Sequence, residues 1–281
     1  MTSASDRPTL VLGGTGKTGR RVAERLTARG LPTRIGSRSA EPPFDWEDQS
    51  TWAPALQGVG SAYFSYYPDL AIPGAAAAVS SLAEVAIEQG VRRLVLLSGR
   101  GEEEAQRAER ALRETDTDWT IVSAAWFMQN FSENYMLESI QAGELVLPAG
   151  DEPEPFVDAD DIADVAVAAL TDDRHIGELY ELTSPRLLSF PEAVGEIADA
   201  TGREIRYVSV SAQDYEAVME EEGVPAEFRS FLNYLFSEVL GRNAYLTDGV
   251  QRAIGREPRD FTEFARDAAA SGVWTNVAVP G

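Results

Sequence analysis

The chain has 281 residues with 24 basic and 46 acidic side chains, so its formal net charge is −22. A surface this negative repels phosphate backbones, which disfavours a general nucleic-acid-binding role. The chain contains no cysteine, which excludes disulfides, thiol nucleophiles and thiolate metal sites. Arginine supplies 23 of the basic residues, so a mechanism that needs lysine must use Lys17, and one that needs histidine must use His175.

The amino-terminal residues are polar, and the apolar run Leu10–Leu12 is too short for a signal peptide. The sequence also lacks a stretch near the roughly 20 apolar residues that cross a bilayer. We therefore expect a soluble, cytoplasmic protein without a membrane or nucleic-acid partner.

Short apolar runs alternate with longer helical patterns over the first two thirds of the chain. The expected strands are Thr9–Leu12, Thr33–Ser37, Ser61–Tyr66, Arg92–Ser98, Trp119–Ser123 and Glu178–Thr183. The expected helices between them are Lys17–Arg29, Ile72–Gln89, Glu102–Glu114 and Asp158–Leu170. This alternation predicts right-handed crossovers and the α/β class, with a Rossmann-like, doubly wound parallel sheet that binds ligands at the carboxyl ends of its strands.

From about Ser184 onward helical patterns dominate. Helices are expected at Phe190–Thr201, Ala212–Glu222, Pro225–Leu240, Gly249–Ile254 and Phe261–Ser271, with one strand at Glu204–Val210. We expect an NAD(P)-binding domain over residues 1–183. Residues 184–281 then form a smaller, mostly helical C-terminal substrate lobe, to which residues near 130–155 contribute.

A glycine-rich turn joins the first expected strand to the first expected helix. Gly14, Gly16 and Gly19 match G-x-G-x-x-G, the dinucleotide-binding pattern in its required strand-to-helix context. The tight turn and the close approach of a pyrophosphate both require residues without a side chain. A Walker A loop is excluded, because Val11 stands where that motif needs glycine.

The end of the second expected strand indicates which dinucleotide binds. NAD-binding proteins usually place an acidic residue there for the ribose 2′-hydroxyl. Here Ser37, Arg38 and Ser39 follow the strand, and the first acid is Glu41. Because arginine binds phosphate through a fork of paired donors, the sequence favours NADP(H). The alternative is that Arg38 is a solvated surface residue.

The inventory of catalytic side chains excludes the common mechanisms. A Tyr-x-x-x-Lys pair is absent, because the residue four before the single lysine is Gly13. His175 lies in a polar connection, which favours a loop residue over a catalytic one, and no metal-ligand spacing is recognisable. What remains is a cofactor that donates hydride to an already electrophilic, largely apolar small molecule, such as an iminium, a quinone or an activated enone.

Two smaller features bear on this site. Tyr66 and Tyr67 lie at the carboxyl end of the third expected strand, where a tyrosine could donate a proton without lysine. The alternative is that they pack under the next loop. The acidic run Glu102–Glu104 is typical of the first turn of a helix, where carboxylates complement the helix dipole.

Three segments resemble the NmrA-like atypical short-chain dehydrogenases, namely Leu12–Arg20, Ala124–Phe131 and Phe156–Ala163. Within that group the chain is most similar to the festuclavine and agroclavine dehydrogenase branch of ergot alkaloid enzymes and its bacterial relatives. The narrower match is carried by Phe44–Asp48, by Thr51 and Trp52, and by Gly255–Ala265. The resemblance covers nearly the whole chain.

The resemblance implies a Rossmann fold, NADP(H) as cofactor and oxidoreductase activity. The cofactor-binding residues that it implies, together with the glycine pattern, are Gly13, Gly14, Thr15, Gly16, Lys17, Thr18 and Gly19 for the pyrophosphate, Ser37 and Arg38 for the adenosine phosphate, Asp45 and Trp46 for adenine, and Tyr66, Tyr67, Ser98 and Trp126 for the nicotinamide side. It points to Phe127, Asn130 and Phe131 for the substrate pocket. No catalytic residue is assigned, and Tyr67 and Ser98 are the candidates.

One departure from the family pattern bears on the substrate. Family members usually have Arg-Pro where this chain has Ser123 and Ala124. A small-molecule substrate is expected but not identified, and a homodimer stays open. The alternative function is an NADP(H)-binding, redox-sensing regulatory protein of the NmrA type without turnover. A nucleotide-sugar epimerase or dehydratase is a third interpretation, which usually needs the missing tyrosine–lysine pair.

Overall fold

The computed structural model describes residues 7–133 and 135–275, so residues 1–6 of the amino-terminal segment considered above lie outside the described residues. The chain forms two compact units. The first unit runs to Ala124 and includes Ala159–Leu182 and Asp248–Glu257. The second contains Ala125–Asp158, Thr183–Thr247 and the chain from Pro258 onward. The domain limits expected at residues 183 and 184 stay a prediction. The structure also places residues 248–257 in the first unit, which the sequence did not indicate.

A parallel sheet forms the centre of the first unit. Its strands are β1 (Thr9–Leu12), β2 (Thr33–Gly36), β3 (Ser61–Phe64), β4 (Arg93–Gly99), β5 (Asp118–Ala124) and β7 (Glu178–Leu182). Within the described residues the order is β2-β1-β3-β4-β5-β7, and every pairing is parallel. The order reverses between β1 and β3, which marks the point where such sheets bind ligands. The expected Rossmann-like, doubly wound fold is confirmed.

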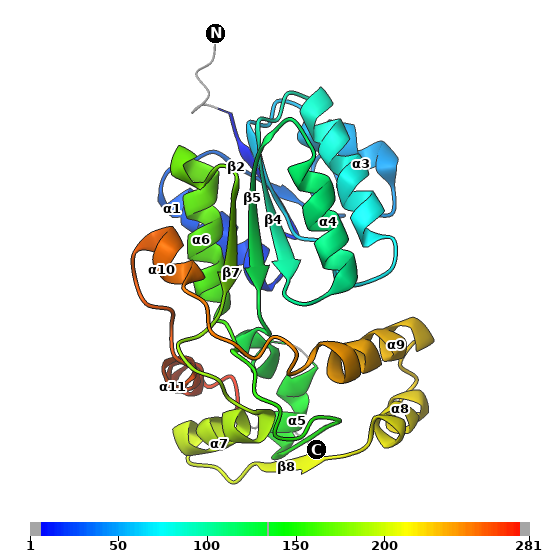
Figure 1. The fold of residues 1–281 in the computed structure, drawn as a ribbon, viewed down its shortest axis with the longest axis vertical. Helices are drawn as coiled ribbons and strands as arrows, with labels where there is room; N and C mark the ends of the chain where they lie inside the picture. Colours follow the sequence, from blue (N-terminus) through cyan, green and yellow to red (C-terminus); the bar gives the residue numbers. More distant parts are fainter. Residues whose placement is uncertain (1–6, 134, 276–281) are drawn as a thin grey trace. The chain divides into compact units, whose positions relative to one another are not determined.

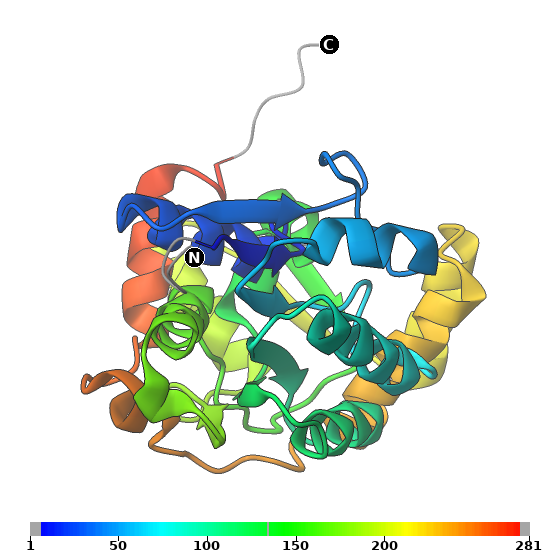
Figure 2. The ribbon, with the colours of Figure 1, turned by 90° about the horizontal axis from the view of Figure 1, so that it is seen from above.

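Helices cover both faces of this sheet. They are α1 (Lys17–Ala28), α2 (Trp52–Leu56), α3 (Ala75–Glu88), α4 (Glu103–Arg113), α6 (Ala159–Thr171) and α10 (Gly249–Ile254). The pair α1 and α6 lies on one face and the pair α3 and α4 on the other (Figure 1). The view from above likewise separates α6 from α3 and α4 (Figure 2). Two covered faces explain why Leu94, Val95 and Leu96 of β4 are all fully buried.

Helix α1 illustrates how the sequence pattern produces these elements. Val22 and Leu26 lie four residues apart and are both fully buried, so one face of the helix packs on the sheet. The helix ends before Gly30, whose φ of +71° permits the left-handed turn that returns the chain to β2. The boundaries expected from the sequence differ from those of α1 by one residue.

The second unit is mostly helical around an aromatic core. Its elements are α5 (Met136–Ala142), β6 (Glu144–Leu147), α7 (Phe190–Thr201), β8 (Arg206–Ser209), α8 (Ala212–Glu221), α9 (Ala226–Tyr234), a π-helical turn at Leu235–Val239 and α11 (Phe261–Ser271). The two strands pair in parallel. Helix α5 and strand β6 were not expected from the sequence, and the helix expected over Pro225–Leu240 ends as a regular α-helix at Tyr234. Among the described residues, no helix combines the length and the apolar character that a membrane span requires.

The first residue of α10 gives a test of how closely this helix packs on β7. A Cβ at Gly249 would lie 2.0 Å from the carbonyl oxygen of Glu181, whereas a Cβ at Gly195 in α7 would meet nothing within 4 Å. We expect Gly249→Ala to lower the free energy of unfolding by about 1–3 kcal/mol through overpacking. Gly195→Ala, the matched control, should raise it by about 0.5–1 kcal/mol because alanine favours a helix. Chemical denaturation of both variants checks the pair, and equal effects would contradict the packing.

Candidate functional site

The glycine turn between β1 and α1 has the backbone geometry that its sequence predicts. Gly13 has a φ of +64°, a conformation that favours glycine. The N–H of Gly16 donates to the carbonyl oxygen of Gly13 at 2.8 Å, and the N–H of Arg20 donates to that of Gly16 at 3.1 Å. The chain therefore reverses within a few residues and enters α1 directly.

Two glycines of the turn are required by close contacts. A Cβ at Gly19 would lie 2.2 Å from the carbonyl oxygen of Gly13, and one at Gly14 would lie 2.9 Å from the side chain of Ile35. Helix α1 begins at an extended Gly16, and in the described chain its first turn has neither a side-chain cap nor an acidic residue. The positive end of the helix dipole thus faces the turn, which suits a bound anion. This geometry fits a dinucleotide pyrophosphate.

The neighbouring strand β3 holds the turn in place. The buried hydroxyl of Tyr63 donates to the Oγ1 of Thr18 at 3.0 Å, which ties the first turn of α1 to β3. Burial raises the pKa of this tyrosine, so the hydroxyl keeps its proton. Ser65 follows β3, and its Cβ would lie 3.3 Å from a Cβ at Gly13. The turn is therefore supported from the side as well as from α1.

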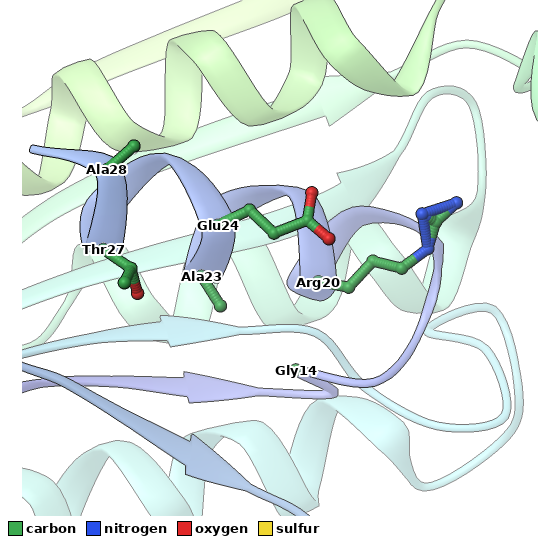
Figure 3. Close-up of a pocket in the computed structure, with 6 residues that line it drawn as sticks. All are labelled: Gly14, Arg20, Ala23, Glu24, Thr27 and Ala28. Carbon is green, nitrogen blue, oxygen red and sulfur yellow. The ribbon is translucent and has the colours of Figure 1, made fainter.

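A shallow groove of about 490 Å³ runs along α1 from this turn. Its lining residues are Gly14, Arg20, Ala23, Glu24, Thr27 and Ala28. Figure 3 shows Arg20 extending from the first turn of α1 beside the glycine turn, with the other side chains following along the same helix. Of these residues only Gly14 belongs to the predicted cofactor set.

The end of β2 presents the predicted arginine to solvent. Arg38 is exposed, and within the part of the chain that the structure describes it forms no ion pair or hydrogen bond. Arg34, by contrast, donates to the carbonyl oxygens of Ala55 and Gln57 at 2.7 and 2.9 Å. Of the two guanidinium groups near this strand, Arg38 is the one available to a ligand.

Asp45 and Trp46 are brought to the end of β3 by an aromatic cluster. The indole N–H of Trp46 donates to the carbonyl oxygen of Ser65 at 3.2 Å, and its ring centroid lies 4.8 Å from that of Tyr66. The indole N–H of Trp52 donates to the carbonyl oxygen of Asp45 at 2.8 Å. The loop after β2 is thus anchored beside the glycine turn, as an adenosine-binding segment requires.

The two tyrosines after β3 differ in their surroundings. Tyr67 is 68% exposed, whereas Tyr66 is half-buried against Trp46. Burial, and then the charge of Glu47, raise the pKa of Tyr66. The surroundings of Tyr66 therefore do not make it a stronger acid, and they supply no substitute for the missing lysine at that position.

Ser98 lies at the carboxyl end of β4 but is engaged inside the unit. Its buried hydroxyl donates to Oε1 of Glu109 at 2.7 Å. Burial raises the pKa of Glu109, and the hydrogen bond from Ser98 acts in the opposite direction. Catalysis by Ser98 therefore stays a prediction that competes with this internal hydrogen bond.

Two carboxyl groups near this edge were not identified from the sequence. Glu102, expected in the first turn of α4, precedes that helix and does not cap it with its side chain. Its carboxyl group is buried instead, and Oε2 forms no hydrogen bond within the described chain. Asp69, after β3, accepts a hydrogen bond from the N–H of Ala71 at 2.9 Å. Only the position of both residues after strand ends could have indicated them.

The predicted substrate residues and Trp126 belong to the second unit. They lie around a short segment in which the N–H of Val157 donates to the carbonyl oxygen of Trp126 and the N–H of Met128 to that of Val157. Phe127 and Asn130 are half-buried. Phe131 is fully buried among the core rings, with its centroid 5.4 Å from that of Phe261. The assignments to Trp126, Phe127, Asn130 and Phe131 stay predictions, and the burial of Phe131 favours a packing role for that ring.

His175 is a buried structural residue of the first unit. Its Nδ1 lies 2.9 Å from the hydroxyl oxygen of Tyr180, and its carbonyl oxygen accepts a hydrogen bond from Thr120. Burial is the main cause that lowers its pKa. The described residues contain no group of three or more acidic or histidine side chains that could hold a metal ion.

Comparisons with known proteins agree with this geometry. The model of the NmrA-like family matches residues 6–266. The uncharacterized oxidoreductase YesF of Bacillus subtilis is 35% identical, over 96% of this chain and 97% of YesF. The agroclavine dehydrogenase of Claviceps fusiformis is 30% identical, over 92% of this chain and 96% of its own length.

Solved structures show the same fold. The NADPH complex of the NADPH-dependent quinone oxidoreductase QOR2 from Escherichia coli superposes with a TM-score of 0.76. The two chains are 19% identical, and the match covers 92% of this chain and 99% of that one. The resemblance stated from the sequence motifs is confirmed.

The contact between Gly19 and Gly13 predicts the effect of a single methyl group on the turn. Gly19→Ala should lower the affinity for NADP⁺ at least tenfold, because the turn must open to admit a Cβ 2.2 Å from a carbonyl oxygen. Gly195→Ala, in the second unit, adds the same methyl group in open space and serves as the control. Titration calorimetry measures both affinities. Unchanged binding by Gly19→Ala would show that the nucleotide does not use this turn.

Proposed function

Because this chain belongs to the NmrA-like family, we propose that it is an NADP(H)-dependent reductase that transfers hydride to a small, electrophilic and largely apolar molecule. The substrate classes that this proposal includes are iminium ions, quinones and activated enones. The observation that carries it is the glycine turn of residues 13–19, where α1 starts without a side-chain cap or an acidic residue, as suits an anion, together with the exposed Arg38 at the end of β2.

The amino-terminal residues of the first unit bind the cofactor in this proposal. The backbone of the glycine turn and the start of α1 hold the pyrophosphate, with Lys17 adding the charge of the single lysine. Arg38 and Ser37 hold the 2′-phosphate, and Asp45 with Trp46 borders the adenine. When bound, the reduced nicotinamide supplies a hydride, and the protein binds and orients the reactants.

The names of the relatives support this assignment. YesF is named an oxidoreductase, the Claviceps protein a dehydrogenase, and QOR2 an NADPH-dependent quinone oxidoreductase. None of the proposed roles needs a tyrosine–lysine pair, which agrees with Lys17 standing inside the glycine turn. A substrate that is already electrophilic accepts hydride without such a pair.

The arginine at the end of β2 allows a test of cofactor choice. Arg38→Ala should weaken NADPH binding at least tenfold and leave NADH binding unchanged, since a charge-assisted hydrogen bond contributes about 1.5–3 kcal/mol. Arg110→Ala, at an exposed position of α4, changes the net charge equally and is the matched control. Titration calorimetry measures the affinities of the wild type and both variants for NADPH and NADH. Equal affinities of wild type and Arg38→Ala for NADPH would contradict the phosphate assignment.

Turnover separates the reductase from a cofactor sensor. The protein should oxidise NADPH when it is offered quinones, cyclic iminium ions or activated enones. The loss of nicotinamide absorbance measures this reaction. Gly19→Ala should lose this activity in proportion to its occupancy by cofactor. Tight NADP(H) binding without turnover on any of the three substrate classes would instead support a regulatory protein that senses the cofactor.

A further inference from the structure

The carboxyl end of β4 holds a carboxylic acid in an unusual setting. A Cβ at Gly99 would lie 2.1 Å from Oε2, 2.3 Å from Cδ and 2.4 Å from Oε1 of Glu102. The carboxyl group of Glu102 therefore fills the space that a side chain at Gly99 would take. It is buried there, and its Oε2 forms no hydrogen bond in the described part of the chain.

The charges around this group are mainly negative. The carboxylates of Asp69, from the loop after β3, and Glu109, from α4, both act on Glu102. The cations nearby act on those two neighbours, because Lys17 faces Asp69 and the Nη2 of Arg113 lies 3.7 Å from Glu109. Glu102 thus experiences repulsion from two carboxylates, while each of them is offset by a cation.

Ser98, Glu104 and Arg100 also lie near this edge and have polar contacts of their own. Ser98 donates to Glu109, and Oε1 of Glu104 accepts the N–H of Gly74 at the start of α3. The Nε of Arg100 lies 3.7 Å from Oε1 of Glu181. Burial, followed by the charges of Asp69 and Glu109, raises the pKa of Glu102 well above its ordinary value. Burial also raises the pKa of Asp69, but the N–H of Ala71 and the charge of Lys17 act against this rise, so the larger upward shift belongs to Glu102.

We propose that Glu102 is the proton donor of this site, and that the protein therefore reduces substrates whose reduction takes up a proton, with quinones as the class to which we commit. This inference rests on the proposed reductase function. The proposal rests on a carboxyl group that packs on Gly99 at the carboxyl edge of β4, with a buried Oε2 that forms no hydrogen bond within the described residues. This edge lies next to the point between β1 and β3 where the strand order reverses. A carboxyl group with a raised pKa holds its proton to higher pH and can then donate it as a general acid.

The reaction balances with these groups. The reduced nicotinamide nucleotide of the proposed function provides the electron pair as hydride. The O–H bond of Glu102 breaks, its proton bonds to the quinone oxygen that gains the negative charge, and the carboxylate recovers a proton from water. An iminium ion needs no such proton, because hydride addition at its carbon already gives a neutral amine. The two substrate classes are therefore distinguished by their need for Glu102.

Glu102→Gln tests this role while keeping the shape of the side chain. With a quinone, kcat should fall on the order of 100-fold, as is typical for loss of a general acid, while NADPH affinity stays unchanged. With a cyclic iminium ion the rate should not change. Glu103→Gln, which replaces the exposed neighbouring acid on α4, is the matched control and should behave as wild type with both substrates.

A second variant tests the charge environment. Wild-type quinone reduction should fall as the pH rises through the raised pKa of Glu102, because only the protonated form donates. Asp69→Asn removes a negative charge beside it, so the pKa of Glu102 falls and the alkaline limb of the profile moves to lower pH. A side chain that only supports the fold would not move this limb. An unchanged profile in Asp69→Asn would overturn the proposal.

A spectroscopic readout needs no turnover. Infrared spectra of the wild-type protein without nucleotide at neutral pH should contain the carbonyl band of a protonated carboxylic acid, and this band should be missing from Glu102→Gln. If the band persists in the variant, or if quinone reduction is unaffected, the proton-donor role is wrong and the reductase function stands. If the wild type reduces nothing, the proposed function fails and the role of Glu102 fails with it.

Discussion

The closeness of two backbone segments at the start of the chain is the constraint on which the rest of the site depends. The first turn of α1 lies so close to the end of β1 that a Cβ at Gly19 would be 2.2 Å from the carbonyl oxygen of Gly13, so Gly19 can carry no side chain. The helix dipole is thereby directed at the turn, and the hydrogen bond from Tyr63 to Thr18 keeps it there. The neighbouring segments, including the loop of Asp45 and Trp46, lie around this contact between α1 and β1.

Four elements have the bounds that their sequence predicted. Strand β1 and helices α7, α10 and α11 have the expected bounds, since each combines a clear apolar period with a recognisable end signal. Strand β6 and helix α5 were missed, because each is short and draws its stability from the core of the second unit. Short apolar runs of this kind do not indicate their own conformation.

The candidate site was predictable where it depends on backbone and less so where it depends on side-chain environment. The glycine turn and Arg38 follow from residue type and position alone. The contrast between Glu102 and Glu103 does not, because consecutive glutamates look equivalent in a sequence. The carboxyl group of Glu102 nevertheless packs on Gly99 with its Oε2 buried, whereas Glu103 is exposed on α4. Burial and neighbouring charges, which set the protonation state, come from residues distant in the chain.

The return of residues 248–257 to the first unit has a consequence for how the protein can be divided. Helix α10 packs on β7, and an Nη2 of Arg256 lies 2.6 Å from the buried Oδ1 of Asp161 in α6. A fragment that stops after β7 would lose this helix and the ion pair between Arg256 and Asp161. The first unit is therefore not an independent module in the linear order of the chain, and an exchange of this unit must transfer its discontinuous segments together.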